Sequence, residues 1–128
     1  MADPAYSAAL LDHFQQPRHA GSLPGDTPGL CTGEAEQPGG GRLVRFWLSV
    51  APDGRIDAIR FKAFGCPATI AAASLASERL AGRSRGEAAA LEAADLARAL
   101  ALPEAREPAA ALVVRALRSA LSGPGRGP

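Results

Sequence analysis

Cys66 is the residue of this 128-residue chain whose type and position are best suited to chemistry. It follows a strand-like segment that ends in Gly65, and Pro67 after it opens a run of small residues typical of a helix. A thiol in that position faces free backbone N–H groups and the positive end of the helix dipole, which both favour its ionised form. Arg60 and Lys62 could add positive potential. We therefore expect a reactive or metal-binding thiolate, in preference to an ordinary buried cysteine.

The second cysteine and the histidines have weaker support as chemical groups. Cys31 lies between residues 21 and 41, a stretch rich in Gly, Pro and charged residues that has no helical or strand period and is predicted to be a long loop. His13 has no second ligand at a metal-binding spacing, so we expect a surface or hydrogen-bonding role at a helix end. His19 has less support still.

The elements that must position these side chains can be read from spacing and turn residues. A helix is expected to open at Asp3 and Pro4 and to end before Pro17. Residues 42–50 and 56–63 alternate between apolar and polar types on either side of a turn, which predicts a hairpin.

Three helices are expected after the hairpin. They should run from Pro67 to about Ala81, from the Ser84–Glu87 capping box to Leu102, and from Pro108 until Gly123–Pro124. Trp47, on the partly polar face of the first hairpin strand, is expected to be partly buried.

Length and charge limit the classes of function. The chain fits one domain, which we place at residues 1–122, with a disordered tail over 123–128. A net charge of +1 without a basic stripe argues against nucleic acid or a membrane surface as partner. No apolar run approaches the about 20 residues of a membrane span, and no targeting segment is evident, so a cytoplasmic protein with thiol chemistry rather than disulfides is expected.

Two motifs resemble a known family. Residues 6–21, which begin Tyr6-Ser7 and contain Asp12-His13 and Pro17-Arg18, and the segment Phe61–Cys66 are similar to the two signature motifs of the IscU/NifU N-terminal family of iron-sulfur cluster assembly scaffold proteins. The resemblance implies an α+β fold, a small antiparallel sheet with helices packed on one face. The family's third strand would have to precede Gly41, where the Gly and Pro content argues against a regular strand.

The resemblance also implies a site, and the chain departs from it. Members of this family hold a [2Fe-2S] cluster with three cysteines, an aspartate and a histidine, and receive sulfur from a cysteine desulfurase. Here only Cys66 is retained. Gly40 stands at the first cysteine, Arg42 at the aspartate, and Pro108 and Ala109 at the His-Cys pair, so the chain is a degenerate member that lacks two of the three family cysteines.

These departures leave several hypotheses open. The first is a scaffold-like, non-enzymatic protein that handles iron or sulfur through Cys66, with Cys31 folded back as a second cluster or metal ligand. Carboxylates of Glu34, Glu36 or Glu107 could instead add ligands, or two chains of a homodimer could share one cluster. The second is an adaptor or regulator of a cysteine desulfurase or of other assembly proteins that binds no cluster. A thiol-dependent enzyme ranks last, because the sequence places no base near Cys66.

Overall fold

The computed structural model describes residues 6–122 and has the expected α+β architecture. The first helix begins at Ala8, after an extended Ser7 that caps it, so the predicted opening at Asp3–Pro4 is wrong. Asp3 and Pro4 themselves and the expected tail over 123–128 lie outside the described residues. In chain order the elements are α1 (Ala8–Gln15), β1 (Leu30–Glu36), β2 (Leu43–Val50), β3 (Ile56–Phe64), α2 (Pro67–Leu80), α3 (Arg85–Ala90), α4 (Ala93–Ala99), the short 3-10 helix η1 (Glu104–Arg106) and α5 (Glu107–Leu121).

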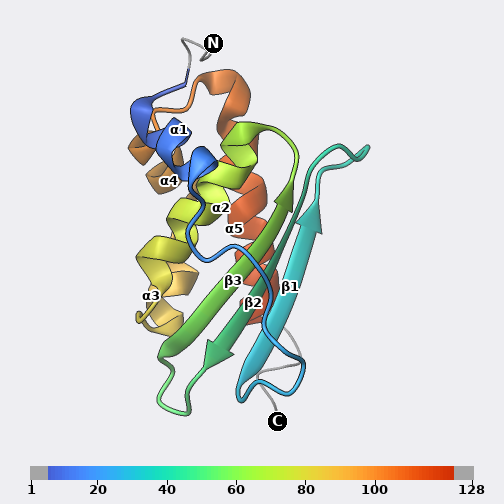
Figure 1. The fold of residues 1–128 in the computed structure, drawn as a ribbon, viewed down its shortest axis with the longest axis vertical. Coiled ribbons are helices and arrows are strands. Elements are labelled where there is room, and N and C mark those ends of the chain that lie inside the picture. Colours follow the sequence, from blue (N-terminus) through green and yellow to red (C-terminus); the bar gives the residue numbers. More distant parts are fainter. Residues whose placement is uncertain (1–5, 123–128) are drawn as a thin grey trace.

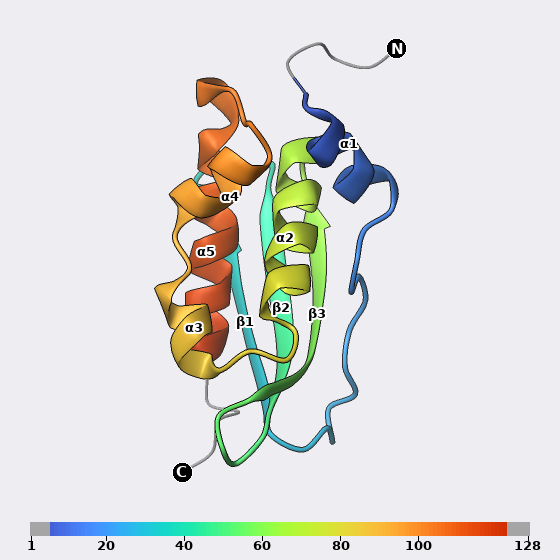
Figure 2. The same cartoon turned by 90° about the vertical axis from the view of Figure 1, so that its left-hand side faces the viewer.

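The sheet has the strand order β1-β2-β3, with both neighbouring pairs antiparallel. The predicted hairpin of β2 and β3 is confirmed. Its inward side chains, among them Phe46 and Ile59, are fully buried, because α2 and α5 lie side by side against that face (Figures 1 and 2). Burial of one face of the sheet by two helices fixes the register, since a slip of one residue would expose the apolar side.

The prediction of a long loop over residues 21–41 is wrong in its second half. Residues Leu30–Glu36 form the regular strand β1, which pairs with β2 along its whole length. Its inward positions are Cys31, Gly33 and Ala35, which are too small to give a visible apolar alternation. Helix α5 explains these small residues, because a side chain at Gly33 would overlap the backbone of Ala120.

Helix α2 begins at Pro67, as predicted, and ends at Leu80, just before the predicted limit. Alanines fill its buried positions, so its backbone lies close to β3. Helix α5 begins at Glu107, directly after η1, rather than at Pro108. Both helices start at the end of the molecule where β3 stops (Figure 1).

The single helix predicted from Ser84 to Leu102 is two helices. The capping box of Ser84 and Glu87 opens α3 as expected. The chain then becomes extended at Leu91 and Glu92, and α4 begins at Ala93. Arg118 of α5 donates a hydrogen bond to the Leu91 carbonyl at 3.3 Å and pairs with Glu92 at 3.5 Å, so contacts with α5 stabilise the break.

Helix α1 packs on α2, on the side opposite α5 (Figure 2). Ser7 is its N-cap, and the Ser7 hydroxyl also donates to the Leu100 carbonyl at 2.6 Å, which links α1 to the end of α4. None of the helices within residues 6–122 combines the length and apolar character needed to cross a bilayer.

Candidate functional site

Cys66 occupies the N-cap position of α2, as the sequence predicts. Gly65 makes the turn from β3 with a φ of +138°, a conformation that favours glycine. A Cβ atom at Gly65 would also lie 2.8 Å from Cγ of Arg42, so the glycine lets the Arg42 side chain pass close to the turn. The turn therefore brings the start of β2 beside the thiol that begins α2.

The surroundings of Cys66 favour the thiolate. Sγ lies 3.5 Å from the hydroxyl oxygen of Thr69, which is buried on the first turn of α2. Burial alone would raise the pKa of the half-buried Cys66 thiol, but the Thr69 hydroxyl, the backbone N–H groups of Thr69 and Ala68, and the positive charge of Arg42 outweigh it and lower the pKa below its ordinary value of 9.0. The sequence predicts that the start of the helix favours the ionised form of Cys66, and the positions of its neighbours support this prediction.

Two features of this site were missed in the sequence. Arg42 is the cation that lowers the pKa of Cys66, whereas Arg60 and Lys62, which we expected, are not among the main causes of the shift. Thr69 was not singled out, although Cys66-x-x-Thr69 has the spacing at which an N-cap residue meets the first helical turn. Arg42 could not have been found by spacing along the chain, because the sheet register brings it to the turn.

Cys31 is not brought together with Cys66. It is fully buried near the start of β1 and pairs with Leu48, which in turn pairs with Ile59. From Ile59 the strand β3 continues five residues to Phe64, roughly 17 Å at the rise of a strand, before it reaches the turn to Cys66. The fold-back that would make Cys31 a second ligand for a shared cluster or metal does not occur within one chain.

The carboxylates of Glu34, Glu36 and Glu107, expected as substitute ligands, do not complete a metal site with Cys66 either. Glu34 pairs with Arg45 at 3.0 Å, and Glu107 faces the groove described below. No group of three or more His, Cys, Asp or Glu side chains within residues 6–122 could hold a metal ion. The described residues therefore do not supply a cluster site on a single chain.

His13 is a hydrogen-bonding residue, as expected, but it is buried rather than on the surface. Its side chain lies between α1 and α2, with Nδ1 2.7 Å from the Ser74 hydroxyl and Nε2 3.5 Å from Glu78. Both ring nitrogens have partners on α2, so His13 is not placed to act as a base for Cys66. Burial and the charge of Arg18 lower the pKa of His13 despite the opposing effect of Glu78.

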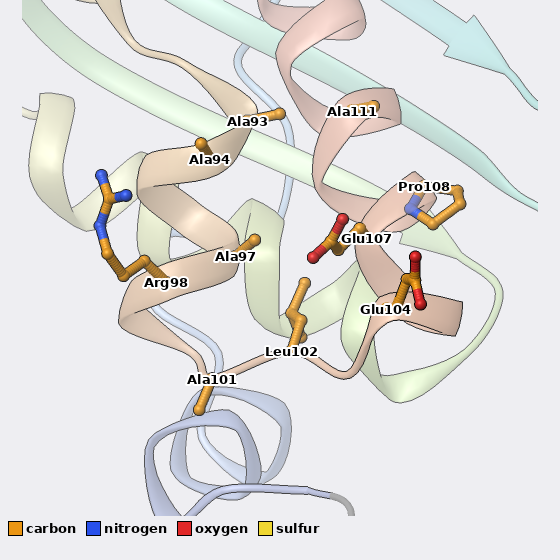
Figure 3. Close-up of a pocket in the computed structure, with 10 residues that line it drawn as sticks. All are labelled: Ala93, Ala94, Ala97, Arg98, Ala101, Leu102, Glu104, Glu107, Pro108 and Ala111. Carbon is orange, nitrogen blue, oxygen red and sulfur yellow. The ribbon is translucent and has the colours of Figure 1, made fainter.

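A groove between α4 and the start of α5 was not predicted. It has a volume of about 780 Å³, and its lining is mostly apolar, with Ala97, Leu102 and Pro108 among the residues. Figure 3 shows Glu107 pointing from α5 toward α4 across this hollow. The spacing of Ala93, Ala97 and Ala101, at every fourth residue, is the sequence signal, because these side chains are too small to fill the space.

Comparisons with known proteins agree with the fold and with the family that the motifs at residues 6–21 and Phe61–Cys66 resemble. Residues 5–123 match the NifU-like N terminal domain. The chain is 34% identical over 117 residues to the iron-sulfur cluster assembly scaffold protein IscU of Azotobacter vinelandii, with 91% of each chain covered. It is 32% identical over 118 residues to IscU of Escherichia coli K12, with 92% of each chain covered.

A solved structure shows the same fold at lower sequence identity. The crystal structure described as a proposed iron-sulfur cluster assembly scaffold protein for the SUF system of Fervidobacterium islandicum superposes with a TM-score of 0.72 at 16% identity, covering 91% of this chain and 96% of that one. Together with the match over residues 5–123, these likenesses establish that the chain belongs to the NifU-like N-terminal domain family.

Proposed function

We propose that this protein takes part in iron-sulfur cluster assembly as a scaffold, not as an enzyme, and that it handles sulfur or iron through the Cys66 thiolate. The observation that carries the proposal is the half-buried thiol at the start of α2, whose pKa is lowered by Thr69, the helix backbone and Arg42. Relatives that match more than nine-tenths of the chain are named scaffold proteins of this process. Thiolates suit the work because soft sulfur binds iron strongly.

A complete cluster needs more ligands than this chain offers. A [2Fe-2S] cluster is typically held by four protein ligands. Cys66 is the only retained family cysteine, and the described residues contain no group of three or more His, Cys, Asp or Glu side chains that could hold a metal ion. We therefore propose that a cluster, if [2Fe-2S] is the cargo, is held between two chains. A second copy with its own Cys66, or another assembly protein, would complete the ligand set.

Of the two cargoes, sulfur fits the charges better. The guanidinium of Arg42 repels a metal cation and attracts the anionic forms of sulfur. With a cysteine desulfurase as partner, the Cys66 thiolate would attack the outer sulfur of the desulfurase persulfide. The bond between the two desulfurase sulfurs breaks, its cysteine leaves as a thiolate, and the transferred sulfur remains on Cys66. This chemistry needs a reduced thiol, which fits the expected cytoplasmic location.

The proposal is tested by sulfur transfer. The chain is incubated with a cysteine desulfurase and radiolabelled L-cysteine, and the label on protein is measured before and after reduction. We expect reducible label on the wild type and on Cys31→Ala, and none on Cys66→Ala. An absence of label from the wild type, while the desulfurase still releases sulfide under reducing conditions, would contradict the proposal.

A second candidate function is that of an adaptor, because most of the family's ligand residues are missing from the chain. With Gly40, Pro108 and Ala109 at the positions of family ligands, the chain could bind a desulfurase as an adaptor without receiving sulfur. In that case Cys66→Ala and the wild type would bind the desulfurase equally well in a pull-down, and neither would take up label.

A further inference from the structure

The outer face of the sheet is without a helix. The helices α2 and α5 cover the inner face, and no helix within residues 6–122 lies on the other one (Figures 1 and 2). The strand register sets the outward side chains in rows across the three strands. One row holds Thr32, Trp47 and Arg60, the next holds Glu34, Arg45 and Lys62, and the last holds Glu36, Leu43 and Phe64.

The chain itself covers two parts of this side of the sheet. Residues 19–21 lie along β3, where Nη1 of Arg60 is 3.5 Å from Nδ1 of His19, and the segment before β1 covers one end. The hydroxyl of Ser49 donates to the Pro28 carbonyl at 2.7 Å, so the segment before β1 crosses the sheet there. At the opposite end Phe64 is 63% exposed, one of the two large apolar side chains that the described residues leave open. We call the group Trp47, Arg45, Lys62, Arg60 and Phe64 the Trp47 patch.

The patch combines an aromatic ring with cations that are held against it. The Arg45 guanidinium lies 5.0 Å and the Lys62 ammonium 6.0 Å from the centre of the Trp47 ring. Arg60 is the direct cross-strand partner of Trp47. A ring bordered by positive groups offers both apolar contact and charge to an incoming segment.

The cations of the patch are not fully neutralised by the chain. Arg45 and Lys62 are direct cross-strand partners, an arrangement of like charges that destabilises a sheet. Glu34 pairs with Arg45, but Lys62 and Arg60 form no salt bridge among the described residues. Nε of Arg45 is buried without a hydrogen-bond partner in the same part of the chain. An external carboxylate near Arg45 and Lys62 would relieve this repulsion.

We infer that the Trp47 patch docks an acidic segment of a partner protein, with carboxylates against Arg45 and Lys62 and an apolar side chain against Trp47 or Phe64. Glu34 and Glu36 on the same face disfavour a continuous polyanion such as nucleic acid. A peptide segment with separated carboxylates avoids these two groups.

The patch is continuous with the thiol. Phe64 ends β3, and only Gly65 separates it from Cys66, so a segment seated on the patch holds its protein beside the start of α2. The role of the partner, to give or take sulfur at Cys66, rests on the proposed function. The docking itself needs neither iron nor sulfur, so the two can fail separately.

Trp47 is the only tryptophan of the chain and reports directly on binding. The probe is a short synthetic peptide that alternates Glu and Phe, titrated into the whole apo protein while tryptophan emission is recorded. We expect saturable binding that weakens with added salt, and a loss of about fivefold in affinity for Lys62→Glu, since a partly exposed charge pair is worth about this factor. Arg115→Glu, the same charge change at an exposed site on α5, should bind as the wild type does.

A second readout separates docking from folding. Because Lys62→Glu replaces a like-charge pair with Arg45 by an opposite-charge pair, its thermal midpoint should rise while its affinity for the peptide falls. Equal affinity of Lys62→Glu and wild type, or equal binding of a peptide that alternates Lys and Phe, would overturn the proposal. So would tighter binding of a single-stranded oligonucleotide, or dimerisation in sedimentation that Lys62→Glu abolishes, since the occupant would then be a nucleic acid or a second copy.

Discussion

At the scale of single residues, the ionisation of Cys66 depends on neighbours that differ in kind. Thr69 supplies a hydroxyl from the same helix, and Arg42, directly before β2, supplies a charge. We predict that Thr69→Val and Arg42→Gln each raise the pKa of Cys66, because each removes a group that favours the thiolate. Iodoacetamide labelling at neutral pH should slow by about threefold in either variant.

The labelling experiment has internal controls. Cys31 is fully buried, so the native chain should react at Cys66, which peptide mapping can verify. Arg115→Gln removes an exposed arginine elsewhere and should label at the wild-type rate. If Arg42→Gln also labels at the wild-type rate, the charge of Arg42 does not reach the thiol.

His13 makes stability depend on pH. Its pKa is lowered in the folded chain, mainly by burial and then by Arg18, while Glu78 and Asp12 raise it and Arg79 lowers it further. The unfolded chain therefore binds more protons than the folded one between the two pKa values. We predict that the free energy of unfolding has its full value above the ordinary pKa of 6.5. It should fall as the pH drops from 6.5 to the lower pKa of His13 in the folded chain, and His13 causes no further loss below that pKa.

The other histidine provides the control for this prediction. His13→Asn removes the titrating group and should flatten the loss of stability below neutral pH in urea titrations. His19→Asn should retain the loss, and asparagine suits the positive φ of 68° at that position. A loss of the same size in His13→Asn would assign the acid sensitivity to other groups.

At the scale of elements, the sequence predicts the helices and strands whose pattern lies within their own residues. It misses the features that depend on contact with α5, far along the chain. The β2–β3 hairpin and α2 follow from alternation, turn residues and the Pro67 start. Strand β1 was missed because its inward residues, Cys31, Gly33 and Ala35, are too small to show an apolar alternation. They are small because α5 packs directly against them. The break at Leu91 was missed because it lies in an alanine-rich stretch and is stabilised by Arg118. For the site, Cys66 could be predicted, whereas Arg42 could not.

The contact between β1 and α5 predicts a large effect from one methyl group. A Cβ atom at Gly33 would overlap the backbone nitrogen of Ala120, so α5 would have to move. Gly33→Ala should lower the free energy of unfolding by about 1–3 kcal/mol, the usual cost of overpacking. Urea unfolding followed by circular dichroism measures it.

Gly25→Ala is the matched control. A Cβ atom there meets nothing within 4 Å, so its free energy of unfolding should stay close to that of the wild type. Unchanged stability of Gly33→Ala would mean that α5 does not pack closely enough on β1 to exclude a methyl group.

At the scale of the whole molecule, the family fold is retained while most of the family ligands are absent. Position 40 lies outside the core packing between the sheet, α2 and α5, so its residue can change without loss of the fold. Position 109 belongs to the core, where alanine and cysteine are both small, apolar residues. A built Cβ atom at Gly40 meets nothing within 4 Å, and Ala109 is fully buried at the start of α5. If only the ligands were lost, replacing them should restore metal binding.

We predict that Gly40→Cys combined with Ala109→Cys binds at least about twice as much iron per chain as the wild type after anaerobic incubation with ferrous iron and sulfide, because three thiolates approach the typical four-ligand set. Iron analysis and the visible charge-transfer absorption measure the gain. The variant Gly25→Cys with Ser119→Cys adds the same number of thiols elsewhere and should gain no colour, and Cys66→Ala should abolish the colour of the restored variant. Equal iron in the restored and control variants would place the obstacle in the geometry or in the charge of Arg42. Adding Arg42→Gln to the restored variant would then distinguish these causes, because it removes the charge without adding a carboxylate ligand.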